Sequence, residues 1–468
     1  IDRRISIAGA IAIGLSSYFI LIIPAGHLTK ASTIPLMSLA IGGFRLMFRK
    51  KYALGFILTV IPSSIALTRH LQMSYYIFMF IGLLFIAELY RHIKEKRYRD
   101  FFIATLIFTA SVVLGLGTNS SSFFANREYL SETMRGGHSD LAKDNDSENK
   151  TDGLDLDYAT AWSYGIDECW TFLIPDYMGG SSNYNVGSDS ELCEMMVQQG
   201  VQRKQAEQFC QSLPTYWGTQ PFTAGPVYMG AIICLLFVLG LLIVKGPYKW
   251  ALLGVTLLSV MLSWGHNWMP LTKFFFDVVP MYNKFRAVSS ILVIAEVTMP
   301  LLGFLALKRL CDDKGVKDLS KSVLTAGGIV VALLFVAMMT TSGFTSPNDA
   351  QMFSQLPEWL ADGIVLQRQS MFQTDVWRSM AFVLLATALL YVFAKSQKFK
   401  STAVLASLLG VLVLADMWQV DKRYMNDSMF SKGNSFEQAF KMQSWEKQIL
   451  DNDKDPNFRV MNLAANTF

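Results

Sequence analysis

The sequence predicts an all-α polytopic membrane protein with about eleven transmembrane helices. Eleven apolar stretches of helical-span length divide the 468 residues, and Lys and Arg fall almost wholly on alternate connections between them. Hydrophobic residues make up 52 % of the chain and charged residues 17 %, whereas soluble domains carry about a quarter charged residues. A bilayer core of about 30 Å needs about 20 apolar residues in a helix, and fewer where long side chains at the ends reach the interface.

The apolar stretches divide the chain into four regions. The first part of the bundle (1–118) holds five spans, and the second part (226–418) holds six, with loops at 265–288 and 345–375. Between them lies a loop of domain size (119–225), and after them a further domain begins (419–468), with 434–451 helical and 458–466 strand-like. The chain starts on Ile and ends in an alternating run, so we expect further segments at both ends. The expected spans are 5–26, 33–48, 53–68, 73–89, 101–117, 227–244, 250–264, 289–307, 323–344, 376–394 and 402–418.

The basic connections set the expected orientation. They contain Arg3 and Arg4, followed by the runs 45–51, 91–99, 245–249, 308–321 and 395–400. Short loops rich in Lys and Arg remain in the cytoplasm. We therefore expect the 119–225 loop and the C-terminus on the extracytoplasmic side. Because topology accounts for the net charge of +4, this charge gives no indication of nucleic-acid binding.

Within the large loop, residues 140–157 are acidic and rich in Asn and Ser, which predicts a solvated, mobile segment. The later part, 162–222, concentrates Trp, Tyr, Gly and Pro and predicts a folded cap. Residues 191–212 read as a helical hairpin broken at Gly200, which would bring Cys193 near Cys210. A disulfide persists in oxidising compartments. The sequence leaves open whether Cys193 and Cys210 form a disulfide or remain free thiols.

Polar residues at the expected outer ends of the spans are the candidates for chemistry. The sequence contains no phosphate-cradling glycine loop, no paired-cysteine metal spacing and no nucleophile elbow. Cations that gather with imidazoles at a membrane surface suit a lipid-linked phosphate or pyrophosphate. Each of them singly could instead anchor a helix at the interface. The candidates are His27, Lys30, Arg69, His70, Lys284 and Arg286.

A metal site has little support in the sequence. Four histidines lie in expected outer segments, namely His27, His70, His138 and His266, but on different loops and without ligand spacing. A divalent metal therefore stays open as a cofactor, and no metal ligand or other cofactor is predicted.

Several short segments together resemble a known family. They are Ser16-Ser17-Tyr18-Phe19, Ala25-Gly26-His27, residues 70–76, Thr133-Met134-Arg135-Gly136, residues 157–165, residues 216–222 and Asn283-Lys284-Phe285-Arg286. Over nearly its whole length the chain resembles the YfhO-like bacterial integral membrane proteins, in the form seen in Bacteroidetes-type bacteria. The resemblance implies a glycosyltransferase of the GT-C architecture in the bacterial inner membrane. Such an enzyme moves a sugar from a polyprenyl-phosphate donor to an extracytoplasmic glycan, lipid or protein acceptor.

The resemblance also implies roles for individual residues. Arg286, Lys284 and Arg69 would bind the donor phosphate, with His27 and His70 donating hydrogen bonds or a proton. GT-C enzymes usually keep a catalytic carboxylate in the first outer loop, which we expect to precede this chain, so Asp167 and Glu168 are minority candidates for the base. Relatives often have Asn at the position of Arg69, so its role does not carry over directly. The residues expected to bind sugar or acceptor are Trp162, Trp170, Tyr216, Trp217 and Gln220.

Two other functions remain open from the sequence. A transporter or lipid flippase needs polar residues near the middle of the bilayer, and the acidic residues within the expected spans are Glu88, Glu296 and Asp416. A non-enzymatic envelope scaffold would use the large loop to bind a partner.

The orientation is tested by introduced cysteines. We expect Ser346→Cys to react with a membrane-impermeant maleimide in intact spheroplasts, because its loop is extracytoplasmic, and Ser320→Cys to react only after lysis. Labelling of Ser320→Cys before lysis would reverse the topology and move the candidate site to the cytoplasmic face.

Overall fold

The structure is a computed structural model of the chain. It describes residues 2–130, 132–136, 153–313, 317–341, 343–396, 398–399, 401–430, 433, 437–438, 440–455 and 457–461. The chain forms two units, Ile1–Met425 and Asn426–Phe468, which we describe separately. His138 and residues 140–152 of the acidic segment lie outside the described residues.

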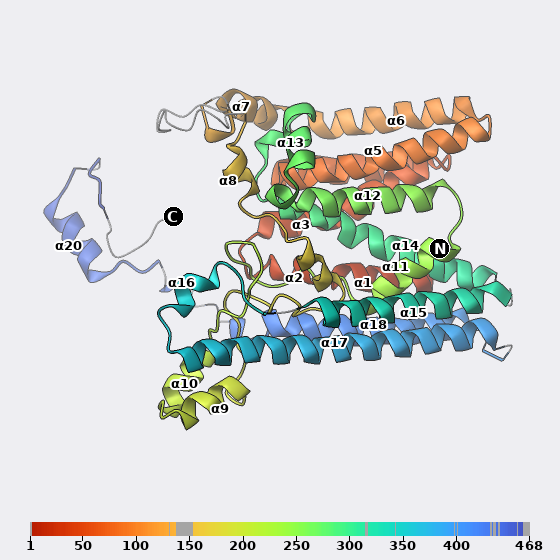
Figure 1. Cartoon of the computed structure of the whole chain (residues 1–468). Helices are drawn as coiled ribbons and strands as arrows, with labels where there is room; N and C mark the ends of the chain where they lie inside the picture. Colours follow the sequence, from red (N-terminus) through yellow and green to blue (C-terminus); the bar gives the residue numbers. More distant parts are fainter. Residues whose placement is uncertain are drawn as a thin grey trace. The chain divides into compact units, whose positions relative to one another are not determined.

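The first unit is a bundle of helices that run side by side (Figure 1). All eleven apolar stretches contain helix. The helices of the first half are α1 (Arg3–Gly14), α2 (Ser17–Leu21), α3 (Leu28–Met47), α4 (Tyr52–Arg69), α5 (Leu71–Lys94) and α6 (Tyr98–Gly117). Those of the second half are α11 (Ala231–Ile243), α12 (Pro247–Ser263), α14 (Val293–Asp312), α15 (Lys317–Thr340), α17 (Glu358–Lys395) and α18 (Thr402–Tyr424).

The predicted class, an α-helical membrane protein, is confirmed at this level. In the described part of the chain, six helices are long and apolar enough to cross a membrane, and they correspond to α5, α6, α14, α15, α17 and α18. Shorter apolar helices occupy Tyr52–Ala66, Ala231–Ile243 and Pro247–Ser263. The described part of the chain contains no named β-strand and only one isolated bridge, between Tyr184 and Leu213. The count of eleven crossings stays a prediction.

The first expected span, 5–26, is broken rather than continuous. The helix stops after Gly14 and resumes at Ser17 as α2. At the break, Ser16 Oγ donates to the Glu296 carboxylate at 3.0 Å, and Ser17 Oγ donates to the Pro226 carbonyl at 2.6 Å. Hydrogen bonds to other segments thus replace part of the helical ladder, which the apolar content of the sequence does not reveal.

The loops expected at 345–375 and 265–288 are largely helical. α16 covers Asp349–Phe353 and α17 already begins at Glu358, so α17 extends well beyond its apolar part. The other segment holds α13 (Met269–Val278) between short 3₁₀ turns η3 (Gly265–Trp268) and η4 (Tyr282–Lys284). Polar residues such as Arg368 and Asp375 are buried against other protein segments. In the sequence, their polarity is typical of a solvent-exposed loop.

The long connections gather at one end of the bundle, which we call the loop end (Figure 1). There lie α7 (Ser120–Leu130), η1 (Met134–Gly136), α8 (Leu156–Thr160), η2 (Asp167–Phe172), α9 (Glu191–Gln198) and α10 (Arg203–Cys210). The turns after α3, α5, α11 and α17, which carry basic residues, lie at the opposite end. Which end faces the cytoplasm stays a prediction.

Small residues allow close helix packing inside the bundle. A Cβ built on Gly240 of α11 would lie 2.7 Å from Leu302 of α14, and one on Gly303 would lie 2.7 Å from Leu236. A Cβ on Gly43 or on Gly55 would likewise lie 2.9 Å from the other's carbonyl oxygen. Association in lipid depends on such close van der Waals packing. These glycines therefore fix how near α11 approaches α14 and α3 approaches α4.

The hairpin expected at 191–212 is present as α9 and α10. Gly200 lies in the left-handed region with φ +88°, which suits the reversal between the two helices. Cys193 and Cys210 are both buried free thiols, and they lie against one another. Burial raises the pKa of the Cys210 thiol to about 11. The expected proximity is thus observed, without a bond between the two sulfurs.

The second unit contains η6 (Asp427–Met429) and α20 (Ser444–Asn452). A capping box between Gln443 and Glu446 starts α20. The boundary lies at Met425 rather than at 418, because α18 continues to Tyr424. Residues 458–461 are not in a strand, and the rest of the segment expected to be strand-like lies outside the described residues.

One buried ion pair joins α17 to two loops. Arg368 is 0 % exposed and donates to both carboxylate oxygens of Asp349, at 2.8 and 2.9 Å. It also donates to the carbonyls of Phe344, Pro214 and Tyr216. We expect Arg368→Ala to lower the stability by about 3–5 kcal/mol, because it leaves a buried carboxylate unpaired.

Thermal unfolding in lipid nanodiscs measures this effect. The control is Arg203→Ala, which breaks the exposed pair with Glu194 and should change the stability by less than about 1 kcal/mol. Equal effects of the two substitutions would show that the Arg368 pair does not hold the loops on α17.

Candidate functional site

Five basic side chains from four segments meet at the loop end, and we call them the cationic cluster. His27 and Lys30 come from the start of α3, His70 from the turn between α4 and α5, Arg135 from η1, and Arg286 from the residues after η4. Their charges act on one another: burial, followed by the Lys30 and Arg286 charges, lowers the pKa of His27, and burial, followed by the Arg286 charge, lowers that of Arg135. The fold therefore concentrates positive charge that the sequence distributes over 260 positions.

His70 is held by the tight turn between α4 and α5. It has an extended backbone (φ −153°) and caps α5 by accepting the Met73 N–H at Nδ1, 3.3 Å away. Burial, together with the Lys30 and His27 charges, lowers the pKa of His70 to about 4. The ring is therefore neutral at pH 7 with its proton on Nε2, which leaves an N–H donor for a ligand.

Lys30 is the half-buried ammonium of the cluster. Its Nζ donates to Ser290 Oγ at 3.3 Å. Burial, and secondly the Arg286 charge, lower the pKa of Lys30 to about 8. The group still carries its charge at pH 7. Among the described residues, no carboxylate forms an ion pair with any member of the cluster.

Arg286 is presented by a strained turn. Met281 and Ala287, both non-glycine residues, have φ of 68° and 55°. The Ala287 N–H donates to the Ala159 carbonyl at 3.0 Å, and Gln72 Nε2 donates to the Arg286 carbonyl at 2.8 Å. The guanidinium itself donates to the Tyr158 hydroxyl at 2.5 Å and remains exposed. Such strain persists where surrounding contacts impose it, often at functional sites.

The other two basic residues of the predicted phosphate site are placed differently. Arg69 is exposed and donates to Ser32 Oγ at 3.1 Å, and its charge does not contribute to the pKa shifts of the cluster. Lys284 contacts the cluster through its carbonyl, which accepts a hydrogen bond from Arg135. The structure thus brings together His27, His70 and Arg286 but leaves Arg69 at the margin.

Glu168 lies at the centre of a second group of predicted site residues. Its Oε1 accepts hydrogen bonds from the Tyr216 hydroxyl and from Gln220 Nε2, each at 2.9 Å, and its Oε2 accepts the Gly165 N–H at 2.9 Å. The residue is 3 % exposed, and burial raises the pKa of its carboxyl to about 7. The neighbouring Asp167 is exposed. A carboxylate with this pKa can exchange a proton near neutral pH.

The predicted sugar-stacking residues mostly pack within the loops. The Trp170 and Trp217 rings lie 6.2 and 6.3 Å from the Tyr177 ring, and Trp217 also lies 5.8 Å from Phe344. Trp162 packs edge-on against Phe222 at 5.1 Å. All three tryptophans are half-buried. Trp170 and Trp217 pack against the hydrophobic core, whereas Trp162 packs on an exposed ring.

Sequence reasoning missed the role of Arg135 and two sets of ion pairs, the Arg368–Asp349 pair described above and a network around Arg423. Arg135 stands in the quoted segment Thr133-Met134-Arg135-Gly136 but was given no role. Arg423 bonds Asp176 at 2.9 Å and Asp375 at 2.7 and 2.6 Å, over sequence separations that no spacing rule covers. Among the described residues, no group of three or more His, Cys, Asp or Glu could hold a metal ion.

The pH dependence of stability tests the crowding of charge around Lys30. Because the pKa of Lys30 is lowered from 10.5 to about 8, the unfolded chain binds more protons than the folded chain between these values. Stability should therefore rise with pH through this window. At pH 7 we expect Lys30→Gln to unfold at a temperature about 2 °C above wild type, with the gap closing as the pH approaches 10.5.

The matched control is Lys273→Gln, an exposed lysine of α13 whose charge does not contribute to these pKa shifts. Its unfolding temperature should follow wild type at every pH. A Lys30→Gln variant that is less stable than wild type at pH 7 would show that the lysine stabilises the fold and is not repelled by its neighbours.

No protein-family model, curated protein or solved structure matches the chain. The family that the sequence motifs resemble, and the GT-C architecture, therefore stay predictions.

Proposed function

We propose that this protein is a membrane glycosyltransferase that moves a sugar from a polyprenyl-phosphate donor to an extracytoplasmic acceptor in the bacterial inner membrane. The observation that carries the proposal is the cationic cluster at the loop end. Lys30, Arg135 and Arg286 contribute positive charge and His70 contributes an N–H donor, without an ion-paired carboxylate among the described residues.

The chemistry of the cluster favours a phosphate. Like charges held close together repel one another, and a multiply charged anion reverses the sign of that interaction. Arginine offers planar paired donors that match phosphate oxygens, and lysine adds a compact charge. The electrostatic interactions of the cluster therefore become favourable only when an anion binds.

The position of the cluster favours a phosphate that is attached to a lipid. Lys30 lies in the first turn of α3, and His70 immediately precedes α5, which is long and apolar enough to cross a membrane. A headgroup at this level would reach the cluster while its polyprenyl chain stayed in the bilayer. A soluble phosphate would satisfy the same donors, and the assay below distinguishes the two.

In the transfer step, the acceptor hydroxyl oxygen forms a bond to the anomeric carbon as the bond from that carbon to the phosphate oxygen breaks. The electron pair stays on the departing lipid phosphate, where the cationic cluster stabilises the growing charge. The hydroxyl proton passes to a carboxylate. Of Asp167 and Glu168, the buried Glu168 with its pKa of about 7 is the better suited acceptor.

A second candidate function, transport or lipid flipping, is favoured by one observation. Glu296 in α14 is 0 % exposed, and its Oε1 has no hydrogen-bond partner in the described part of the chain. Buried ionisable groups inside membrane helices often mark ion or substrate paths. Proteoliposomes that contain a lipid-linked sugar separate the functions: consumption of the donor indicates transfer, relocation without consumption indicates flipping, and neither indicates a scaffold.

The proposal predicts a specific effect of Arg286→Lys. If the guanidinium grips the leaving phosphate, this change keeps the charge but loses the paired geometry, at about 1.5–3 kcal/mol. Turnover of a polyprenyl-phosphate sugar in proteoliposomes should fall roughly ten- to a hundredfold. Expression and thermal stability should stay near wild type, because the side chain is exposed.

Lys273→Arg serves as the control, since it exchanges the same two residue types at an exposed site. Competition by soluble pyrophosphate without any turnover of the lipid-linked sugar would point to a soluble phosphate ligand. Full activity of both Arg286→Lys and Arg286→Gln would remove Arg286 from the site.

A further inference from the structure

A polar groove lies between the chain segment that leads into α9 and one face of α17. It consists of two adjoining cavities of about 490 and 240 Å³ that share Val186, Gln367 and Ser370 in their walls. We call it the α17 groove. None of its lining residues belongs to the cationic cluster or to the Glu168 group. Its size falls within the range of small-molecule sites.

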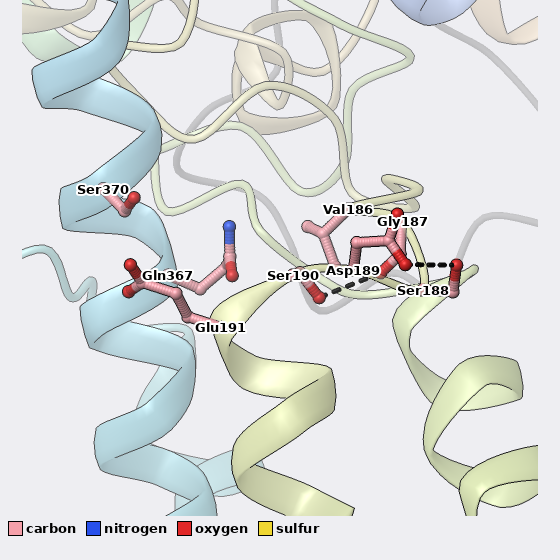
Figure 2. Close-up of a pocket in the computed structure, with 8 residues that line it drawn as sticks. All are labelled: Val186, Gly187, Ser188, Asp189, Ser190, Glu191, Gln367 and Ser370. Atoms are coloured by element: carbon pink, nitrogen blue, oxygen red, sulfur yellow. Dashed lines mark hydrogen bonds between the residues drawn. The ribbon is translucent and has the colours of Figure 1, made fainter.

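The walls of the larger cavity carry hydroxyl, carboxylate and amide groups. Figure 2 shows Ser188, Asp189 and Ser190 on the loop side, and Gln367 and Ser370 on α17 opposite. The loop is ordered by its own hydrogen bonds. Ser190 Oγ donates to the Gly187 carbonyl at 2.9 Å and caps α9 by accepting the Cys193 N–H at 3.3 Å. The wall is therefore preformed.

Gln367 is the group that points to a ligand. Its amide projects from α17 towards the loop that carries Ser190 (Figure 2). The residue is only 9 % exposed, and its Oε1 accepts no hydrogen bond from any described residue. An amide oxygen that is shielded from water and lacks a donor is unfavourable and uncommon in folded proteins. Because Gln367 lines both cavities, a rotation of its amide would bring this oxygen to a donor supplied by a ligand in the groove.

A network of one arginine and two carboxylates forms part of the wall of the smaller cavity. Arg423 pairs there with Asp176 and Asp375, and all three residues line the cavity. Tyr184 adds an aromatic ring, and Thr374 adds a hydroxyl. This network gives the groove a rigid boundary whose strongest charges are already paired.

We propose that the α17 groove binds a saccharide with neutral or amine-bearing rings. Hydroxyls on adjacent sugar carbons both donate and accept, so they match carboxylates, amides and serine hydroxyls together. Asp189 and Glu191 repel anions, and the predominance of polar groups disfavours a lipid tail. In the proposed transferase the groove would hold the acceptor glycan, and that role alone rests on the proposed function.

Saturation-transfer NMR tests binding directly, on the full chain in nanodiscs of phosphatidylethanolamine and phosphatidylglycerol, which contain no sugar headgroup. The probes are maltotriose, which is neutral, and the glucosamine trimer, which bears amines. We expect saturation transfer to at least one of them. Gln367→Leu should raise its Kd about fivefold, as for one lost hydrogen bond, and Ser370→Ala, a milder change in the same wall, should also weaken binding.

Gln373→Leu is the matched control, because Gln373 is an exposed α17 glutamine that lines neither cavity. The proposal would be overturned if neither trisaccharide bound, or if Gln373→Leu weakened binding as much as Gln367→Leu does. It would also be overturned if trilysine, a cationic peptide without sugar rings, bound and neither trisaccharide did. Lys30→Gln should leave saccharide binding unchanged, so loss of sugar transfer in that variant would concern the cationic cluster and not the groove.

Discussion

The arrangement of the loop end depends on two arginines, one buried and one half-buried, that tie the loops to α17 and α18. Arg368 joins α17 to Asp349 and to the carbonyls of Pro214 and Tyr216. Arg423 joins α18 to Asp176 and Asp375. The hydroxyl of Tyr216 then contacts Glu168, so the position of that carboxylate rests on the Arg368 contacts. Buried pairs are costly to break, which makes them effective at fixing one arrangement of the loops.

Charge is distributed unequally over the loop end. On the side of α17 and α18 the cations are paired with carboxylates, as Arg368 and Arg423 show. On the side of α3 and α5 the cations face one another, and burial together with the Arg286 charge lowers the pKa of Lys30. The mutually repelling cations near α3 and α5 do not by themselves increase the free energy of unfolding. Functional sites are often poorly stabilised when their ligand is absent, as a compromise between stability and function. The mutual repulsion of these cations is the physical reason for assigning the anion to the side of α3 and α5.

How much the sequence reveals depends on whether a contact is local. The helices follow from long apolar stretches, and the α9–α10 hairpin follows from polarity and Gly200, since both signals lie within one segment. The early start of α17 was missed, because some polar residues of 358–375, such as Arg368 and Asp375, are buried by partners far away in the chain. The hydrogen bonds of Glu168 to Tyr216 and Gln220 cross about fifty positions, so the sequence named all three without showing that they meet.

One segment connects the two parts of the candidate site. It begins near Tyr158, which contacts Arg286, and ends at Glu168. Between them the Trp162 carbonyl accepts the Ser289 N–H at 3.2 Å, and the Thr160 carbonyl lies 3.0 Å from His266 Nδ1. The backbone that carries Arg286 is thus bonded at several points to the backbone that leads to Glu168. The proposed transferase would need its phosphate-binding groups and its base in a fixed relation, because small displacements of reacting groups greatly reduce the rate. These main-chain hydrogen bonds provide such a relation before any substrate binds.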